Sequence, residues 1–182
     1  MIQPAAIVYT SNTGHTAQYA LLLAERIHLA AYPLSRIKEL PKGTAVIYLG
    51  WLMAGTVKGY KKAARRFAIS AVCGVGMGAT GSQMTDVREK NAIAADVPVF
   101  TLQGGFDMQK LRGVYKLMMT MVAKTVGKKL AEQPQRSPDE DAMLVMLTRG
   151  GNYVSADNLA EVIAWYCESQ EYAFPAPNIP MV

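Results

Sequence analysis

Short apolar runs rich in β-branched residues recur along the first hundred residues, and a segment with helical patterning follows each of them except the run at 29–34. Five such runs are expected to be buried strands, at residues 5–9, 29–34, 45–49, 69–75 and 97–102. Strands that alternate with helices require right-handed crossovers and a parallel sheet covered on both faces. The alternation therefore predicts an α/β protein with a doubly wound, five-stranded parallel sheet.

Four segments that follow the runs have helical patterning. The first starts at His15, and its apolar residues fall at helical spacing as far as Ile27. A basic helix is expected over residues 58–67 and a polar helix over 83–93. A longer helix follows the last strand, and we interpret its apolar stripe as a face of the core. The stripe consists of Leu111, Val114, Tyr115, Met118, Met121 and Val122.

At 182 residues the chain is the right length for one domain. The polar stretch 132–136 divides a core at residues 1–131 from a helical C-terminal extension at 132–182, which we expect to pack on the same domain. Ser137 to Glu140 has a capping-box pattern that predicts a helix ending at Gly150. Ser155 can cap a last helix, whose buried face would comprise Leu159, Val162, Ile163 and Tyr166.

Composition excludes several classes of protein. Hydrophobic residues make up 51% of the chain and charged residues 18%, yet no apolar run approaches the roughly 20 residues that cross a bilayer. The N-terminus lacks the pattern of a secretory signal, and the two cysteines form no CxxC pair, so we expect a cytoplasmic protein. The net charge of +5 is not accompanied by a nucleic-acid-binding motif. We expect no nucleic-acid partner and no membrane span, and peripheral membrane association stays open.

The loop after the first strand has the composition of a phosphate site. Ser11, Thr13 and Thr16 supply three hydroxyl groups, and Gly14 lets the backbone approach a ligand closely. The loop leads into a helix N-terminus, where unpaired N–H groups favour an anion. Since the loop lacks Lys and Arg, it suits a terminal phosphate that stays in place. The alternative is that these hydroxyls only cap the helix.

The loops after the third and fourth strands offer surfaces for a flat ring. Trp51 is the best stacking candidate and Met53 the second, and the glycines of the later loop let backbone pass close to a ligand. The alternative for Trp51 is a core position at the end of a strand. The candidate ligand contacts of these loops are Gly50, Trp51, Leu52, Met53, Ala54, Gly74, Val75, Gly76, Met77 and Gly78.

The residues from Ile7 to Thr16, followed by Ala20 and Leu23, resemble the N-terminal fingerprint of the flavodoxin family. The spacing of the later strands extends the resemblance to about residue 131. Residues 102–107 and the Met-rich helix after them are most similar to the protoporphyrinogen-oxidase-type flavodoxin-domain proteins.

The resemblance implies a flavodoxin-like sheet in the order 2-1-3-4-5 and FMN as the cofactor. The isoalloxazine would lie between the loops after strands 3 and 4, and the phosphate on the first loop. The first-loop residues so implied are Thr10, Ser11, Asn12, Thr13, Gly14, His15 and Thr16. His15 departs from the family pattern, in which Asn is usual, and we expect it to be exposed on the first turn of the helix.

An FMN-dependent redox protein is the function that these features favour, either an electron carrier or a small oxidoreductase with a quinone- or protoporphyrinogen-type substrate. Its partner would be a redox protein or a small anionic molecule. The basic residues Lys58, Lys62, Arg65 and Arg66 form either a docking surface or a solvated face. No catalytic side chain and no metal site is predicted, because a bound flavin carries the redox step and the chain has only two histidines. The alternative function is a non-redox binding or regulatory module that has lost FMN.

Overall fold

The computed structural model describes residues 2–106, 113–136, 144–145 and 150–173. Its centre is a parallel sheet in the order β2-β1-β3-β5-β6. These strands are β1 (Ala6–Thr10), β2 (Ala31–Pro33), β3 (Ala45–Met53), β5 (Ala68–Gly76) and β6 (Val99–Gln103). They correspond in chain order to the five predicted strands, so the predicted α/β class and the order 2-1-3-4-5 of a flavodoxin-like, doubly wound sheet are confirmed.

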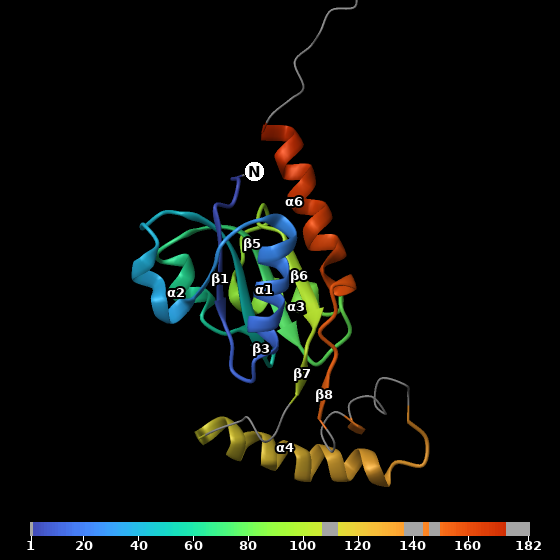
Figure 1. Ribbon diagram of the computed structural model, residues 1–182. Coiled ribbons are helices and arrows are strands. Elements are labelled where there is room, and N and C mark those ends of the chain that lie inside the picture. The colour runs from blue at the N-terminus through green and yellow to red at the C-terminus, as the bar shows by residue number, and fades with distance from the viewer. Residues whose placement is uncertain (1, 107–112, 137–143, 146–149, 174–182) are drawn as a thin grey trace, which may run out of the picture.

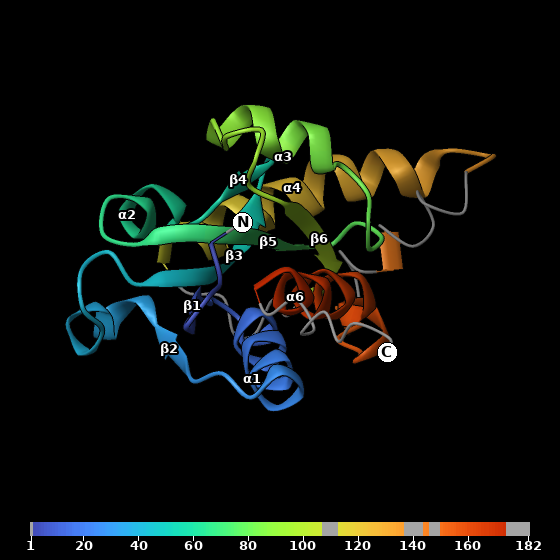
Figure 2. The ribbon, with the colours of Figure 1, turned by 90° about the horizontal axis from the view of Figure 1, so that it is seen from above.

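Helices cover both faces of this sheet, as Figure 2 shows. One face carries α1 (His15–Ile27) and α6 (Ala160–Ala173), and the other carries α2 (Tyr60–Ala64) and α3 (Met84–Asn91). Two short 3-10 helices, η1 (Leu34–Glu39) and η2 (Asp157–Leu159), precede β3 and α6. Each face of the sheet has its own hydrophobic cluster, as expected where apolar strands are buried on both sides.

The C-terminal helix belongs to one of these clusters. Leu159 and Val162 are fully buried with Tyr19 and Leu23 of α1, so the apolar face predicted after Ser155 is confirmed. The Tyr19 hydroxyl donates a hydrogen bond to the carbonyl oxygen of Gln103 at 2.5 Å. These contacts join α1 and α6 to each other and attach them to the β6 edge of the sheet.

Tyr48 is the central side chain of the opposite cluster. Its hydroxyl donates to the carbonyl oxygen of Lys58 at 2.7 Å and accepts a hydrogen bond from Thr10 at 2.8 Å. Burial raises the pKa of Tyr48 to about 12. Gly59, at φ +84°, passes so close that an added Cβ would lie 2.2 Å from the Tyr48 hydroxyl oxygen. Only glycine fits at this position.

The third strand runs further than the sequence predicted. Residues 50–53 were expected in a loop, but they continue β3, which then turns into the antiparallel strand β4 (Thr56–Val57). The prediction was wrong because Gly50 makes room for packing and does not end the strand: a Cβ there would lie 2.6 Å from Val57 Cγ1. Gly74 makes room in the same way beneath Leu52, and β5 continues to Gly76. The basic helix is also shorter than the predicted 58–67, because Gly59 adopts a left-handed conformation just before α2.

Figure 1 shows α4 (Gly113–Glu132) lying beyond the carboxyl ends of the strands and not on a face of the sheet. The chain leaves the core through β7 (Gly105–Phe106) and returns through β8 (Gly151–Asn152), and these two strands pair in antiparallel orientation. The prediction that Met118 and Met121 face the core was wrong, since they are 37% and 62% exposed. The stripe has helical periodicity, but the helix does not pack on the sheet.

Two expectations fall on residues outside the described ranges. They are the position of Leu111 and most of the helix expected from Ser137 to Gly150. Among the helices that the structure does describe, none combines the length and apolar character needed to span a membrane.

Candidate functional site

A cavity of about 620 Å³ lies at the carboxyl ends of β3, β5 and β6. This is where a doubly wound sheet binds its ligands, and the volume is typical of a small-molecule site. Its walls come from the loop after β1, the β3–β4 hairpin, the loop after β5, the end of β6 and the helix α4.

The cavity brings together most of the residues singled out in the sequence. Ten of the seventeen candidates line it, from all three of the loops that were expected to converge. They are Asn12, Thr13, Trp51, Leu52, Met53, Ala54, Val75, Gly76, Met77 and Gly78. Gly50 and Gly74 instead lie beneath neighbouring side chains, and Thr10 directs its hydroxyl to Tyr48.

Trp51 forms part of the cavity wall, and its side chain is only partly buried. Its ring meets the edge of Tyr115 from α4, with the centroids 5.2 Å apart and the planes at 88°. The Lys58 ammonium lies 5.7 Å from the centroid of the Trp51 ring, within the range of a cation–π contact. A core position for Trp51, the alternative considered from the sequence, does not match this environment.

The first loop ends at Gly14, the N-cap of α1, which has a φ of +103°. Glycine has no side chain, so no hydroxyl occupies the position from which side chains usually cap a helix. The Thr13 hydroxyl is 2.9 Å from Nδ1 of His15, and the Ser11 hydroxyl is buried without a hydrogen-bond partner. The loop therefore presents hydroxyl and backbone groups that the interpretation as helix caps does not explain.

His15 is buried, with 6% of its surface exposed, so the expectation of an exposed side chain on the first turn was wrong. The ring packs against the Gly104–Gly105 backbone, where a Cβ on Gly105 would lie 2.6 Å from His15 Nε2. The two glycines leave the space that the imidazole fills. This contact joins residues far apart in the sequence, so the local pattern could not reveal it.

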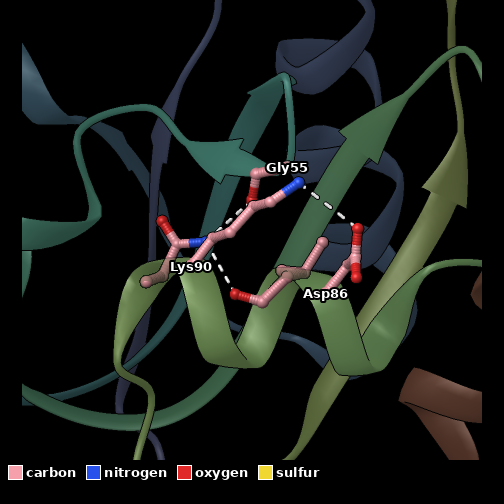
Figure 3. Close-up of polar contacts among 5 residues, drawn as sticks. Gly55, Asp86 and Lys90 are labelled. Carbon is pink, nitrogen blue, oxygen red and sulfur yellow. Dashed lines mark hydrogen bonds and ion pairs between the residues drawn. The ribbon is translucent and has the colours of Figure 1, made fainter.

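The β3–β4 hairpin is held in place by Asn91 of α3. Its side-chain oxygen accepts a hydrogen bond from the Val57 N–H at 2.9 Å, and its side-chain nitrogen donates to the carbonyl oxygens of Gly55 at 2.9 Å and Val87 at 2.7 Å. Figure 3 shows the two donated bonds, with the Lys90–Asp86 ion pair on the same helix. Asn91 is buried and fixes the turn that carries Met53 and Ala54 into the cavity wall.

Several residues of the cavity had no place in the sequence-based site. Tyr115, Met118 and Met119 come from α4, and further polar groups come from the loop after β5 and from β6: Ser82, Gln83, Thr101 and Gln103. The Met-rich pattern of α4 was visible in the sequence, but its period could not distinguish a core face from a cavity wall. Among the described residues, those that line this cavity include no carboxylate, histidine or cysteine side chain. The cavity thus offers aromatic, thioether, amide and hydroxyl groups to a ligand.

A smaller cavity of about 300 Å³ lies on the other side of the first loop. It is lined by Tyr9, Thr10, Ser11, Pro33, Leu34, Ser35 and Lys62. Lys62, which was predicted from the sequence to lie on a basic surface of its helix, thus also lies beside the first loop. Arg66, from the same predicted patch, donates to the carbonyl oxygen of Leu40 at 2.6 Å and stacks on Phe67. The predicted basic face is therefore divided among separate environments.

In the described ranges, no three His, Cys, Asp or Glu side chains gather in a way that could hold a metal ion. Comparisons with protein-family models, curated proteins and solved structures found no match to this chain.

Proposed function

We propose that this chain is a flavodoxin-like protein that binds FMN in the 620 Å³ cavity and functions in redox chemistry. The observation that carries the proposal is the meeting of two kinds of surface in one place. An apolar and aromatic wall, with Trp51, Leu52 and Met77, adjoins a hydroxyl-rich loop at the N-terminus of α1. FMN has a flat apolar ring system at one end and a phosphate at the other.

The donor groups of the site fit this ligand. Trp51 and Met77 would hold the faces of the ring, and the backbone at Gly76 to Gly78 is available for the polar edge of the flavin. Ser11 and Thr13 would hold the phosphate with the N–H groups of α1. The buried Ser11 hydroxyl, which has no hydrogen-bond partner, supports the proposal of a polar ligand group beside it.

FMN, when bound, would supply the electron-transfer chemistry. The protein's contribution would be to bind and orient it and to exclude water with apolar side chains. We propose either electron transfer or a simple flavin-dependent oxidation, in which the flavin would carry the redox step, and we name no catalytic side chain. We include in the proposal the cytoplasmic location expected from the sequence, where the free cysteines Cys73 and Cys167 would stay reduced.

The partner would be a redox protein or a small anionic or quinone-like molecule. Tyr115, Met118 and Met119 give the α4 side of the cavity an apolar and aromatic lining, which favours a flat apolar substrate of the quinone or protoporphyrinogen type. Exposed Lys61 and Arg65 outside the cavity favour an anionic partner through long-range attraction.

Titration of the cofactor-free protein with FMN and with riboflavin tests the proposal. We expect quenching of flavin fluorescence with a 1:1 end point and a clear preference for FMN. Dithionite should reduce the bound flavin, and a soluble quinone should reoxidise it. A protein that binds neither flavin would contradict the proposal and favour the non-redox module.

A further inference from the structure

The smaller cavity places a lysine opposite the first loop. Ser11 of that loop and Lys62 of α2 both line its wall, and Ser35 adds a third polar side chain. The cavity has a volume of about 300 Å³. These three residues lie on different segments, and only the tertiary fold brings them together.

Ser11 is the link between the two cavities. Its hydroxyl oxygen is buried and has no hydrogen-bond partner, whereas Thr13, two residues further on, lines the larger cavity. A buried hydroxyl without a hydrogen-bond partner costs free energy unless a ligand or a water molecule forms a hydrogen bond with it. The first loop thus lines both cavities, with Ser11 at the smaller one and Asn12 and Thr13 at the larger one.

Lys62 is available to such a ligand. It is exposed, whereas its neighbours Tyr60 and Ala63 are buried and fix α2 against the sheet. Within the described parts of the chain, Lys62 has no ion-pair partner. Its ammonium group is therefore not committed to a carboxylate there.

We propose that Lys62 is the cationic ligand of the cofactor phosphate, so that the phosphate lies between Ser11 and the Lys62 ammonium group. This inference rests on the proposed function, because it assumes that FMN occupies the larger cavity. It changes the nature of the phosphate site, since the first loop alone offers only neutral donors. A lysine adds a charge-assisted contact to a ligand group that carries nearly two negative charges.

The expected consequence is a strong selection for the phosphorylated flavin that depends on ionic strength. A neutral site would distinguish FMN from riboflavin by hydrogen bonds alone, and added salt would change that preference little. A lysine contact at the edge of the smaller cavity weakens as salt is added, because the screening length falls to about 8 Å at physiological ionic strength.

The experiment compares Lys62→Gln with Lys61→Gln, a matched control on the same short helix. Lys61 is also exposed but does not line the cavity. Dissociation constants for FMN and riboflavin are measured by fluorescence quenching at low and at physiological salt. We expect K62Q to weaken FMN binding about tenfold or more at low salt, the size of one charge-assisted hydrogen bond, and to change riboflavin binding less than twofold. K61Q should change both less than twofold.

Each result has a distinct meaning. Equal FMN affinity in the two variants, at both salt concentrations, overturns the role of Lys62 and leaves the proposed function intact. A wild-type protein that binds neither flavin overturns the proposed function itself. Circular dichroism checks the fold of K62Q, and Lys62→Arg, which keeps the charge, should retain most of the FMN affinity. An arginine variant as weak as K62Q would also contradict a charge-based role.

Discussion

The hydrogen bonds of Asn91 allow the sharpest test of how the cavity wall is held. Replacing Asn91 with Ala removes one bond from the Val57 N–H and two to the carbonyl oxygens of Gly55 and Val87. Val57 is 2% exposed, so its N–H has no access to water in the folded protein. Each buried backbone group left without a partner costs about 1–3 kcal/mol, and Gly55 is only partly buried. We expect the free energy of unfolding to fall by about 2–4 kcal/mol.

Equilibrium urea unfolding measures this change. The control is Asp86→Asn, which breaks the exposed ion pair with Lys90 at 3.3 Å on the same helix. Such a pair contributes at most about 1 kcal/mol, so the control should unfold nearly as the wild type does. The hairpin turn has positive φ angles at Ala54 (+48°) and Gly55 (+78°), and it loses its anchor in N91A. Flavin affinity should therefore fall in N91A and not in D86N.

The variant Asn91→Asp adds a pH test of the same contacts. One oxygen of the introduced carboxyl group can still accept a hydrogen bond from the Val57 N–H. The other oxygen faces the two carbonyl oxygens to which Asn91 Nδ2 donates in the wild-type protein. The carbonyl oxygens repel the ionised carboxylate, whereas the protonated carboxyl group can donate a hydrogen bond to one of them. The pKa of the introduced carboxyl group in the folded protein should therefore rise above its unfolded value of about 3.9. Stability of N91D should then be highest below that unfolded value and decline as pH rises through the folded pKa. If the free energy of unfolding of N91A lay within about 0.5 kcal/mol of the wild-type value, the hydrogen bonds of Asn91 would not hold the hairpin as described. The absence of this pH dependence in N91D would contradict the same conclusion.

Three further predictions concern single side chains. Replacing Thr13 with Val should weaken FMN binding about tenfold or more, a loss of roughly 1.5–3 kcal/mol, and leave riboflavin binding nearly unchanged. Equal losses for the two ligands would contradict the placement of the phosphate on this loop. Trp51 fluorescence should be quenched in the FMN complex and recover on FMN release, and an unchanged signal would place the flavin away from Trp51. Cys167 is exposed and should react with a maleimide in the native protein, whereas Cys73 is buried and its pKa is raised to about 12 by burial, so it should react only after unfolding. Mass spectrometry of native and urea-treated samples counts the labels, and rapid native labelling of both would contradict this.

The regular part of the fold was predictable because each strand and helix shows its own periodicity. The five strands and the buried face around Leu159 and Val162 follow from local patterns. The end of β3 was missed because Gly50 looks like a loop residue in the sequence, although in the sheet it makes room for Val57. His15 was misplaced because its burial depends on two glycines about ninety positions later.

The candidate site likewise has a part that could be predicted from the sequence and a part that could not. The loops after the strands were identifiable, because topology sends the carboxyl ends of parallel strands to one edge of the sheet. The contributions of Tyr115 and Lys62 were not, because they depend on where α4 and α2 lie in space. A helical stripe shows that one face is apolar, but it does not say what that face meets.

The pairing of β7 with β8 has a consequence for how this protein can vary. Gly105 lies opposite Asn152 and Phe106 opposite Gly151, so the chain leaves and re-enters the core at adjacent points. The helix α4 lies in the chain between these points, where β7 and β8 already pair with each other in a two-stranded sheet of their own. A short turn from Phe106 to Gly151 would close the same gap and leave the layers of the sheet and their helices untouched. The elements that give the protein its architecture are therefore separable from the element that completes the cavity, and the two can change at different rates in evolution.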